Sequence, residues 1–525
     1  MQIGEILAGN ARRCPQELAW TFDGGSWTWS QANQRVNRLA NALCAKGLKA
    51  QDRVAFLADN SHRLAELYFA LAKANLIAVP INSRSVAREI DYVLQAVDAR
   101  AFFVSRNLEA RLNGVSTDLS RFACVAGIDM GHGQPCDYEE MLAAAASEEP
   151  GADFPRSSIR AIKFTSGTTG APKGVISTHH QYLLSTFNYL LQSPLAQEDR
   201  CLLALPMTSG VGVQMLTAYC YRACPTRILP RFDAGTVLDA IEREGVTRLY
   251  VVPTMLAALA DAQTARRRDL SSMRLVEYAG GPAPISLVRR AAEALRVPLS
   301  QTYGSSESGG QLAILPVTDH QRLLAASGSR RASESLPFGR ESPGYHIRIL
   351  DDSGNEVPDG EIGEMVVKSD ALMSGYWNQP ELTAEVLREG WLYTGDLVRR
   401  DAQGFLTIVD RKRDTIRTGG FNVHSAEVEA VLSEHPAVRE VAVIGEPDDY
   451  WGEAIVACVV PHGHVACEEA GLRRFCEQNL ASYKRPKRFR FMSALPKTST
   501  GKVRKVELRA TEMTGETGIG AKEQA

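Results

Sequence analysis

The chain has 525 residues, of which 44% are hydrophobic and 23% charged, and its formal net charge is −2. A chain of this length exceeds a single hydrophobic core and is expected to form two or more domains. The near-neutral charge gives no electrostatic attraction to nucleic acid or to an anionic membrane. No apolar run reaches the ~18 residues of a transmembrane helix and residues 1–16 lack a signal-peptide pattern, so a cytoplasmic protein is expected.

Up to about residue 410, strand-like and helix-like segments alternate along the chain. A helix is predicted over residues 35–43, because Val36, Leu39 and Leu43 share one face, and Ser30 is its expected N-cap. Short apolar runs that end in turn residues suit buried strands: RVAFLADNS (53–61), LIAVPIN (76–82), ARAFFVS (99–105), RLYVVPT (248–254) and LVEYAGG (275–281). This alternation is typical of an α/β fold with doubly wound sheets.

The second part of the chain changes in character. A polar, Gly- and Pro-rich connection is expected over residues 325–344, and later strand-like pieces predict a small β subdomain: HIRIL (346–350), EMVVKS (364–369) and FLTIVD (405–410). A charged, exposed hinge is expected at VDRKRDTIRTGGFN (409–422). Beyond it, helices and strands are predicted in an α+β order over residues 425–432, 440–446, 455–461 and 472–480.

The sequence therefore predicts two domains. Residues 1–410 form a large N-terminal domain of layered α/β subdomains with a small β subdomain. Residues 411–525 form a small, mobile α+β domain of normal domain size, with a disordered tail from residue 511.

Ten cysteines are scattered through the chain, and no C-x-x-C pair occurs. Cys220 and Cys224 stand four apart, but no second pair or histidine cluster completes a zinc site. Reduced, buried thiols are expected.

The segment FTSGTTGAPKGV (164–175) has the composition of a phosphate-binding loop. Its glycines let the backbone approach a ligand closely, and successive free N–H groups bind an anion. It is not a Walker A loop, because Pro172 stands where the second glycine belongs and Lys173 is followed by Gly174. It follows the predicted strand IRAIKF (159–164), at the end where α/β sheets bind ligands.

Four further motifs follow in order: YGSSE (303–307), YTGDL (393–397), DRKRD (410–414) and PKTSTGK (496–502). With TSGTTGAPKG, their order and spacing resemble the adenylate-forming superfamily of acyl- and aryl-CoA synthetases, carrier-protein-loading adenylation domains and firefly luciferase. The resemblance runs from about residue 6 to residue 509. It implies a two-step reaction, in which a carboxylate attacks the α-phosphate of ATP and a thiol, usually of CoA, then displaces AMP. The small domain is expected to rotate between the steps.

The resemblance implies an ATP site. Lys173 is the expected counter-charge in a loop that holds the β- and γ-phosphates through Thr165, Ser166, Gly167, Thr168, Thr169 and Gly170. Glu307 is the implied Mg²⁺ ligand, with Thr168 as a weaker one. Asp396 is placed to accept both ribose hydroxyls, and Arg411 to contact ribose or phosphate. The nucleotide is expected against two further segments, made by Gly280, Gly281, Pro282, Tyr303, Gly304, Ser305 and Ser306.

Lys502 is the implied catalytic residue, since a positive donor aimed at the charge that develops between carboxylate and α-phosphate lowers the barrier. Arg413 occupies the hinge position in DRKRD. Gly419 and Gly420 are expected to line a pantetheine tunnel, where side chains would block passage.

The chain departs from the family pattern after a Leu-Pro pair. In LPMTSGVGV (205–213), Thr208 and Ser209 replace the usual aromatic-His pair, and Gly210 and Gly212 either open room for a larger acid or allow close packing. The candidate acid-pocket residues are small and uncharged: Ser209, Gly212, Val213, Thr254, Gly280, Tyr303, Ser305 and Gly310. Their lack of charge argues against a dicarboxylate and favours a medium-chain fatty or aromatic monocarboxylate.

The leading hypothesis is an ATP-dependent, AMP-forming carboxylate–CoA ligase that uses ATP, Mg²⁺ and coenzyme A. The alternatives are a stand-alone adenylation enzyme that loads a carrier protein, an adenylate-forming ligase with an amine or other non-thiol acceptor, and a non-catalytic nucleotide-binding homologue. The presence of Lys173, Glu307, Asp396 and Lys502 counts against the last. Candidates for a basic patch that binds the CoA 3′-phosphate are Arg439, Lys484 and Arg488. A homodimer is an open alternative to a monomer.

Overall fold

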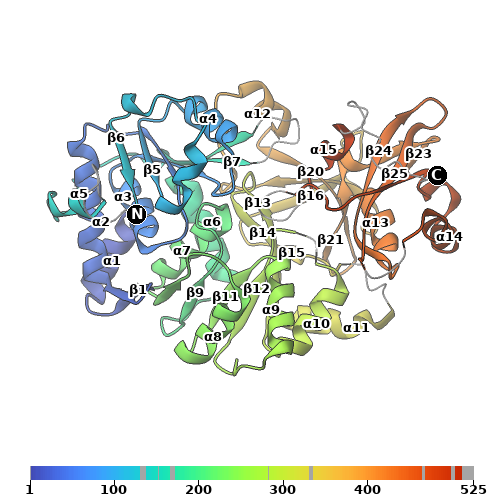
Figure 1. The fold of residues 1–525 in the computed structure, drawn as a ribbon, viewed down its shortest axis with the longest axis horizontal. Helices are drawn as coiled ribbons and strands as arrows, with labels where there is room; N and C mark the ends of the chain where they lie inside the picture. The colour runs from blue at the N-terminus through green and yellow to red at the C-terminus, as the bar shows by residue number, and fades with distance from the viewer. Residues whose placement is uncertain are drawn as a thin grey trace, which may run out of the picture.

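The computed structural model describes residues 2–129, 138–151, 153–165, 172–281, 283–329, 335–463, 467–497 and 503–510. Two large β-sheets and three layers of helices form the body of a large N-terminal domain, and a smaller domain from the C-terminal part of the chain lies beside it (Figure 1). The predicted α/β class is confirmed.

The first large sheet has seven strands in the order β18-β8-β7-β4-β3-β5-β6. Its parallel strands are β3 (Arg53–Leu57), β4 (Ile77–Ile81), β5 (Ala101–Val104), β6 (Cys124–Gly127) and β7 (Ile159–Thr165). The edge strands β8 (Lys173–Thr178) and β18 (Gly375–Tyr376) are antiparallel. Every residue of β4 and β5 is buried, as expected for parallel strands covered on both faces.

The second large sheet has nine strands in the order β15-β14-β13-β12-β11-β9-β10-β1-β2. Its strands are β1 (Leu18–Phe22), β2 (Gly25–Thr28), β9 (Cys201–Leu203), β10 (Thr226–Ile228), β11 (Arg248–Val251), β12 (Leu275–Tyr278), β13 (Leu299–Ser305), β14 (Gly310–Leu315) and β15 (Arg340–Glu341). The six strands from β13 to β1 in this order are parallel, whereas β14, β15 and β2 are antiparallel additions.

The largest hydrophobic core lies between the two sheets and is filled by one layer of helices. This layer comprises α1 (Glu5–Arg13), α2 (Trp29–Ala45), α3 (His62–Lys73), α5 (Tyr138–Ala143), α6 (His179–Gln192) and α7 (Gly210–Tyr221). The outer face of the seven-stranded sheet is covered by α4 (Ala87–Ala96). The outer face of the nine-stranded sheet is covered by α8 (Ala234–Glu244), α9 (Pro253–Ala265), α10 (Ile285–Leu295) and α11 (Val317–Ala326).

A small antiparallel sheet lies between the body and the C-terminal domain (Figure 1). It contains β16 (His346–Leu350), β17 (Ile362–Lys368), β19 (Leu387–Arg388), β20 (Trp391–Arg400) and β21 (Leu406–Arg411), and α12 (Pro380–Val386) precedes β19. Its core includes residues of β14 and β8, so it is anchored to both large sheets. The predicted small β subdomain is confirmed.

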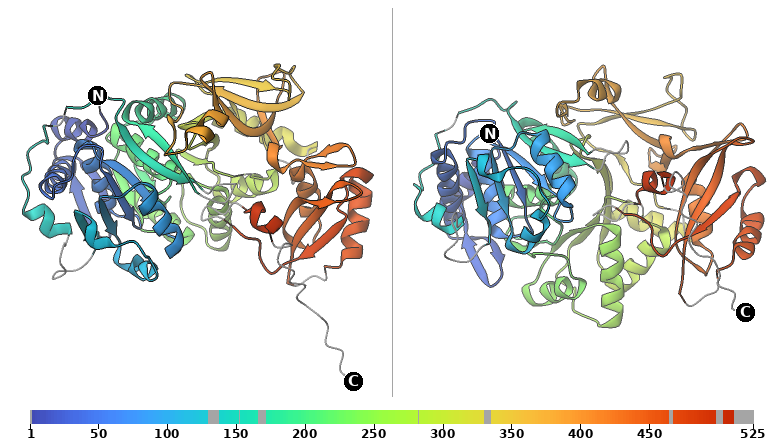
Figure 2. Two further views of the ribbon diagram at one scale, coloured as in Figure 1. Left: turned by 90° about the horizontal axis from the view of Figure 1, so that it is seen from above. Right: turned by 45° about the horizontal axis from the view of Figure 1, so that its top comes forward.

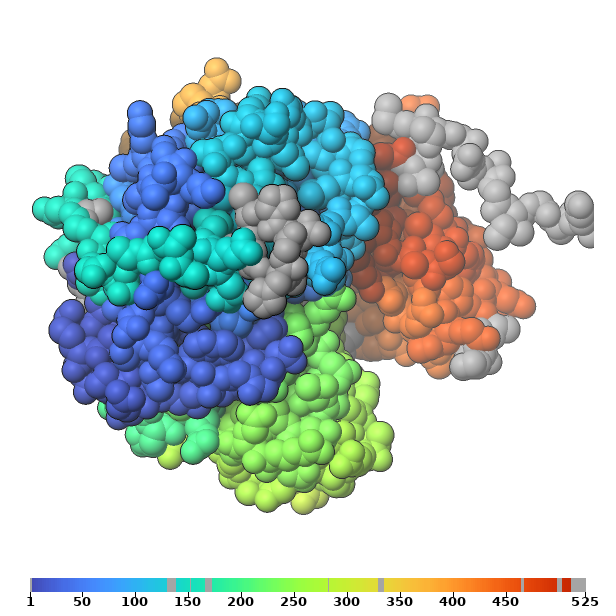
Figure 3. All heavy atoms as spheres, turned by 60° about the vertical axis from the view of Figure 1, so that its left-hand side comes forward, coloured from blue at the N-terminus to red at the C-terminus, as the bar shows by residue number. Residues whose placement is uncertain are grey.

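The C-terminal domain has a five-stranded sheet of its own. The strands are β22 (Ile416–Thr418), β23 (Phe421–Val423), β24 (Val438–Asp448), β25 (Gly452–Pro461) and β26 (Arg488–Phe491), and the helices are α13 (Ser425–Ser433), α14 (Glu469–Asn479) and α15 (Lys505–Ala510). Figures 2 and 3 show this domain, in orange and red, at one end of the molecule beside the large domain. At the junction, Ser425 Oγ donates to Asp410 at 3.0 Å, and Arg509 pairs with Asp414 at 2.9 Å.

Two local predictions are corrected. The N-cap of α2 is Thr28 instead of Ser30, because Thr28 and Gln31 form a reciprocal capping box and the helix begins two residues earlier than expected. The connection expected over residues 325–344 is partly regular: it starts in the end of α11 and a 3₁₀ turn at Ser327–Ser329 and contains β15.

Within the described residues, no helix is long and apolar enough to cross a membrane. The cysteines in these parts of the chain are all free thiols, and no three His, Cys, Asp or Glu side chains there gather as a metal cluster.

Candidate active site

The expected phosphate loop lies at the end of an antiparallel pair of strands. Thr165, the last residue of β7, pairs in register with Lys173, the first residue of β8. Lys173 directs its Nζ toward the ring of Tyr376 on β18, at 5.3 Å from the ring centroid. Five of the loop positions named from the sequence lie outside the described residues: Ser166, Gly167, Thr168, Thr169 and Gly170.

Glu307 lies in the turn between β13 and β14, which belongs to the other large sheet. Ser305 and Ser308 stabilise this turn by reciprocal backbone-to-hydroxyl hydrogen bonds of 2.8 and 3.0 Å. The Glu307 carboxylate accepts a hydrogen bond of 3.2 Å from the hydroxyl of Tyr376. Tyr376 therefore contacts both Glu307 and Lys173, and it brings the ends of the two sheets together.

A second group forms where β13 meets the small β subdomain. Asp396 on β20 lies opposite Arg411 on β21, and the two form an ion pair of 2.6 Å. The Tyr303 hydroxyl donates to the other carboxylate oxygen of Asp396, and the Tyr303 ring stacks on Phe338 at 4.2 Å. Burial and the nearby Asp396 raise the pKa of Tyr303 well above its usual value, so the phenol stays neutral and donates. The structure thus brings together three residues that the sequence named separately.

The glycines of these motifs differ in what they require. A Cβ on Gly304 would lie 1.8 Å from the carbonyl oxygen of Gly310, so no side chain fits there. Gly280, directly after β12, has φ = +91° but no close neighbour, and Gly281 is equally uncrowded. Backbone conformation therefore explains Gly280, whereas packing explains Gly304. Pro282 lies outside the described residues.

The residues proposed for the acid pocket lie mostly on α7 and around it. Ser209 is the N-cap of α7 and accepts from the Gly212 N–H at 3.1 Å. A Cβ on Gly212 would lie 2.1 Å from the Pro206 carbonyl oxygen, and one on Gly310 would lie 2.3 Å from Ser185 Oγ. Of the two explanations offered by the sequence for Gly212, close packing is therefore the one the structure bears out.

The remaining pocket candidates differ in exposure. Val213 is buried, whereas Thr254 at the start of α9 and Ser305 are exposed. Ser306 is partly buried beside Gly210.

One charged residue of this region was missed from the sequence. Lys163 on β7 is only 9% exposed, and the point where a Cβ on Gly210 would lie is 3.4 Å from its Nζ. Burial, and to a lesser extent Arg160, lowers the pKa of Lys163 to about 8, while Glu307 acts in the opposite direction. A lysine therefore lies close to the candidate pocket residues, which are themselves uncharged. The signal in the sequence was a lysine in the predicted strand IRAIKF, two residues before the phosphate loop motif TSGTTGAPKG.

The C-terminal candidates lie at the junction and on the sheet of the small domain. Arg413 is part of a short 3₁₀ turn, Lys412–Asp414, directly after β21, and its Nε lies 3.9 Å from Asp414. Gly419 and Gly420 form the two-residue turn of the β22–β23 hairpin, with φ of +55° and +81°. Positive φ at both positions is what a tight hairpin turn demands.

Lys502 lies outside the described residues. The chain is described on both sides of it, where Lys497 and Val503 form an antiparallel bridge and Lys497 pairs with Glu440 on β24 at 2.6 Å.

Each of the basic residues named for CoA is engaged with another group of the small domain. Lys484 is engaged with Glu427 at 2.6 Å, and Arg488 with Glu446 at 3.1 Å, whereas Arg439 donates to a backbone carbonyl. Aromatic rings lie close to the Gly419–Gly420 turn instead: Phe421 is exposed, and Trp451 and Tyr483 are partly buried. Phe421 stacks on Tyr483 at 4.5 Å, Trp451 contacts Gly419, and Lys487 Nζ lies 4.3 Å from the Trp451 ring centroid. We call Phe421, Trp451, Tyr483 and Lys487 the aromatic face.

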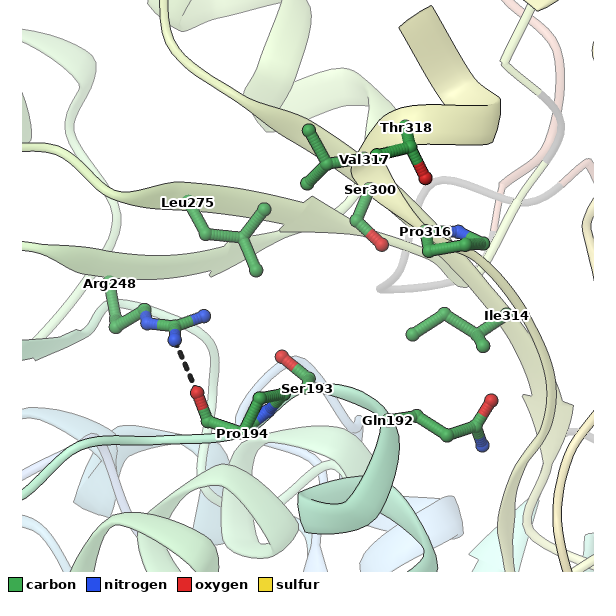
Figure 4. Close-up of a pocket in the computed structure, with 10 residues that line it drawn as sticks. All are labelled: Gln192, Ser193, Pro194, Arg248, Leu275, Ser300, Ile314, Pro316, Val317 and Thr318. Carbon is green, nitrogen blue, oxygen red and sulfur yellow. Dashed lines mark hydrogen bonds between the residues drawn. The ribbon is translucent and has the colours of Figure 1, made fainter.

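A cavity of about 260 Å³ lies away from all of these groups (Figure 4). Leu275, the first residue of β12, lines this cavity, and Gly280 follows the opposite end of the same strand. Its one charged side chain, Arg248, is paired with Asp199 at 3.2 Å and donates to the Pro194 carbonyl. This cavity holds none of the predicted site residues.

The sequence matches the AMP-binding enzyme family over residues 7–377 and the AMP-binding enzyme C-terminal domain over residues 427–502. The chain belongs to the AMP-binding enzyme family. The predicted adenylate-forming superfamily is thereby confirmed.

Relatives in this family match almost end to end. A feruloyl-CoA synthase of an Amycolatopsis species is 35% identical over 97% of this chain and 98% of its own length. An indoleacetate–CoA ligase of Aromatoleum aromaticum is 32% identical over 97% and 98%. ATP-bound MatB from Rhodopseudomonas palustris superposes with a TM-score of 0.86, at 27% identity over 98% and 99% of the two chains. The predicted enzyme class, an AMP-forming ligase of the acid–thiol type, agrees with these members of the AMP-binding enzyme family.

We predict that the two glycines of α7 respond differently to alanine. Gly212→Ala places Cβ against a backbone carbonyl and should destabilise the protein by about 1 to 3 kcal/mol, the usual cost of overpacking. Gly210→Ala meets only the flexible end of Lys163 and should change stability by less than about 0.5 kcal/mol. Thermal unfolding of both variants beside the wild type measures this, and equal stability of all three proteins would contradict it.

Proposed function

We propose that the protein is an AMP-forming carboxylate–CoA ligase that first makes an acyl-adenylate and then transfers the acyl group to CoA. The observation that carries the proposal is the meeting of Glu307 and Lys173 on Tyr376, with the Asp396–Arg411 pair at the end of the neighbouring strand. These four charged residues and Tyr376 come from separate segments of the chain. Their arrangement suits a nucleotide triphosphate, whose phosphates and ribose need cations and carboxylates at different ends.

ATP is proposed to bind with its ribose on Asp396 and its phosphates toward Lys173 and the loop at residues 165–170. A carboxylate accepts two hydroxyls at once, and Arg411 pairs with Asp396 at 2.6 Å. Gly280 and Gly281 leave the backbone open beside the base, and Tyr303 offers a ring. Arg411 lies within reach of the same nucleotide.

Glu307 fits a Mg²⁺ ligand. It is a partly buried carboxylate whose described neighbour is a neutral phenol, and burial and Glu307 together raise the pKa of Tyr376 so that this phenol stays protonated. Mg²⁺ is usually held by one or two carboxylates together with substrate phosphates, and Thr168 is proposed as a second, weaker ligand. When bound, the ion would neutralise charge on the departing pyrophosphate.

The small domain is proposed to begin at residue 411 and to rotate about Arg413 between the two half-reactions. Lys502 would serve the first of them. On either side of it, Lys497 and Val503 form a bridge, and Lys497 pairs with Glu440 on β24. In the second, the thiol would approach past Gly419 and Gly420, and the aromatic face beside this turn offers rings and one lysine for the nucleotide part of CoA.

The acid is proposed to be an aromatic monocarboxylate, with a medium-chain fatty acid as the second candidate. Two relatives that match along nearly the whole chain are named for aromatic acids, ferulate and indoleacetate. Ser209, Val213 and Gly310 themselves have small or apolar side chains. A carrier protein or an amine as acceptor is less favoured, because these relatives are named as CoA-dependent enzymes. The cytoplasmic location and the homodimer remain predictions from the sequence.

The direct test is pyrophosphate release from ATP and Mg²⁺ over a panel of carboxylic acids, with and without CoA. We expect at least one aromatic acid to stimulate release and CoA to make the reaction turn over many times. Release that stops near one equivalent despite CoA would contradict CoA as acceptor. Absence of release with every acid would contradict the proposed function.

The ribose assignment is tested with a pair of variants. Asp396→Ala should raise the KM for ATP about tenfold or more, because charged hydrogen bonds contribute about 1.5 to 3 kcal/mol and 1.4 kcal/mol is a factor of ten. Tyr303→Phe keeps the ring and removes only the hydroxyl that Asp396 accepts from, so its KM should stay close to that of the wild type. An unchanged KM in Asp396→Ala would exclude the ribose role.

Lys502→Ala separates the two half-reactions. Adenylate formation should fall by about 10²- to 10³-fold, as when one preorganised donor is removed from a developing charge. Thioester formation from a synthetic acyl-adenylate should be largely unaffected, because that step needs no stabilisation of the pentacovalent phosphorus. Equal loss in both steps would contradict the assigned role of Lys502.

A further inference from the structure

Lys163 is a buried cation that forms an ion pair with no carboxylate among the residues that the structure describes. It lies on β7, in the seven-stranded sheet, and its side chain is 9% exposed. It forms no hydrogen bond or ion pair with any residue that the structure describes. Charged side chains this deeply buried are normally paired, because losing water without a partner costs free energy. The burial of Lys163 without a partner among the described residues therefore requires an explanation.

A bulge in β7 determines which way Lys163 faces. The pairing of β7 with β8 shifts register between Ile159 and Ala161, so one extra residue, Arg160, is inserted. Ala161 then packs into the core between the two sheets, whereas Ile162 packs into the core on the outer face. Lys163, one residue further, returns to the inner side, where α7 begins.

The end of the Lys163 side chain reaches the start of α7. The point where a Cβ on Gly210 would lie is 3.4 Å from Lys163 Nζ and 3.7 Å from Ser306 Oγ. Gly210 is the first residue of α7, a helix of 12 residues, and helix N-termini carry partial positive charge. A lysine cation, a helix N-terminus and a hydroxyl donor therefore surround one position that has no side chain of its own. All three favour an anion there.

The charged groups around Lys163 do not remove the preference for an anion at the start of α7. Arg160, on the same strand, is 4% exposed, lies over the ring of Tyr182 at 3.5 Å and adds positive charge. Glu307 is the one carboxylate among the described residues whose charge acts on Lys163, and it forms no ion pair with it. The local balance is therefore positive on the α7 side of Glu307.

We propose that Lys163 binds the reacting carboxylate of the acid substrate and holds it beside Glu307 for attack on ATP. This inference rests on the proposed function. Lys163 lies on the side of the site where Ser209 and Val213 lie, whereas Lys173 serves the phosphate loop from the other strand of the same pair. Because the sequence has Ser209 in place of a histidine, and Ser209 is engaged in capping α7, Lys163 supplies the cation at this helix start.

In the step it supports, a carboxylate oxygen forms a bond to the α-phosphorus and the bond from this phosphorus to pyrophosphate breaks. Lys163 keeps its protons throughout. It acts by orienting the nucleophile, so its removal should weaken binding of the acid more than binding of ATP.

The test uses the full chain with Lys163→Met and Lys163→Arg. Calorimetric titration measures binding of benzoate, cinnamate, indole-3-acetate and octanoate, and of the corresponding neutral amides. We expect Lys163→Met to bind the acids at least tenfold more weakly than the wild type, Lys163→Arg to restore most of the affinity, and amide binding not to depend on residue 163. The matched control is Arg160→Met, which removes the other buried cation of β7 and should leave acid affinity within about threefold of the wild type.

Thermal unfolding without ligand distinguishes a binding role from a structural one. Lys163→Met should be as stable as the wild type or more so, because it removes a buried, unpaired charge. A lower melting temperature would show that Lys163 stabilises the fold and would overturn the proposal.

The outcomes also separate this inference from the proposed function. Unchanged affinity of Lys163→Met for an acid that the wild type binds overturns the lysine assignment alone. So does a variant that keeps its affinity for these acids and loses only malonate or succinate, because the lysine would then bind the far end of the substrate. If the wild type binds none of the acids and releases no pyrophosphate with them, both proposals fail.

Discussion

The site depends on the contacts of Tyr376. This residue lies on a two-residue strand that pairs with β8, far along the sequence from the other strands of that sheet. Its hydroxyl donates to Glu307 from the nine-stranded sheet, and its ring lies beside Lys173 from the seven-stranded sheet. A single side chain thus sets the distance between a carboxylate and a cation that two independent sheets provide. Tyr376 therefore links the two charged residues that are expected to act on one substrate.

Burial is the second constraint, and it acts differently on the charged groups of the site. Asp396 is buried but paired with Arg411, and its carboxylate can accept hydroxyl groups. Lys163 is buried and unpaired, and its pKa falls to about 8 for that reason. Sites that bind charged substrates commonly keep such a group at the expense of stability. Asp396 is thus paired within the protein, whereas the proposed partner of Lys163 is a ligand.

Small residues near the site serve two purposes that their composition does not distinguish. Gly304, Gly212 and Gly310 leave no space for a Cβ, since a carbonyl or hydroxyl oxygen already occupies it. Gly280 and Gly210 have open space or a flexible neighbour beside them. The glycines of the first group let strands and helices approach closely. Those of the second group leave space beside the backbone.

The sequence by itself determined the fold class, the small β subdomain, several helices and strands, and the family. These properties depend on local periodicity and on motifs whose residues are neighbours in the chain. Motif order also placed Tyr303, Asp396 and Arg411 in one site, and the structure brings these three into contact. Tertiary structure alone decided the rest. Whether Gly212 leaves space for a substrate or allows close packing depends on the Pro206 carbonyl, six residues away, which the turn into α7 brings close. In the sequence, Lys163 is one of two basic residues in the strand IRAIKFT. Only the bulge at Arg160 and the position of α7 show that it faces the site. Such facts depend on which face of a strand meets which helix, and a register shift of one residue reverses that face.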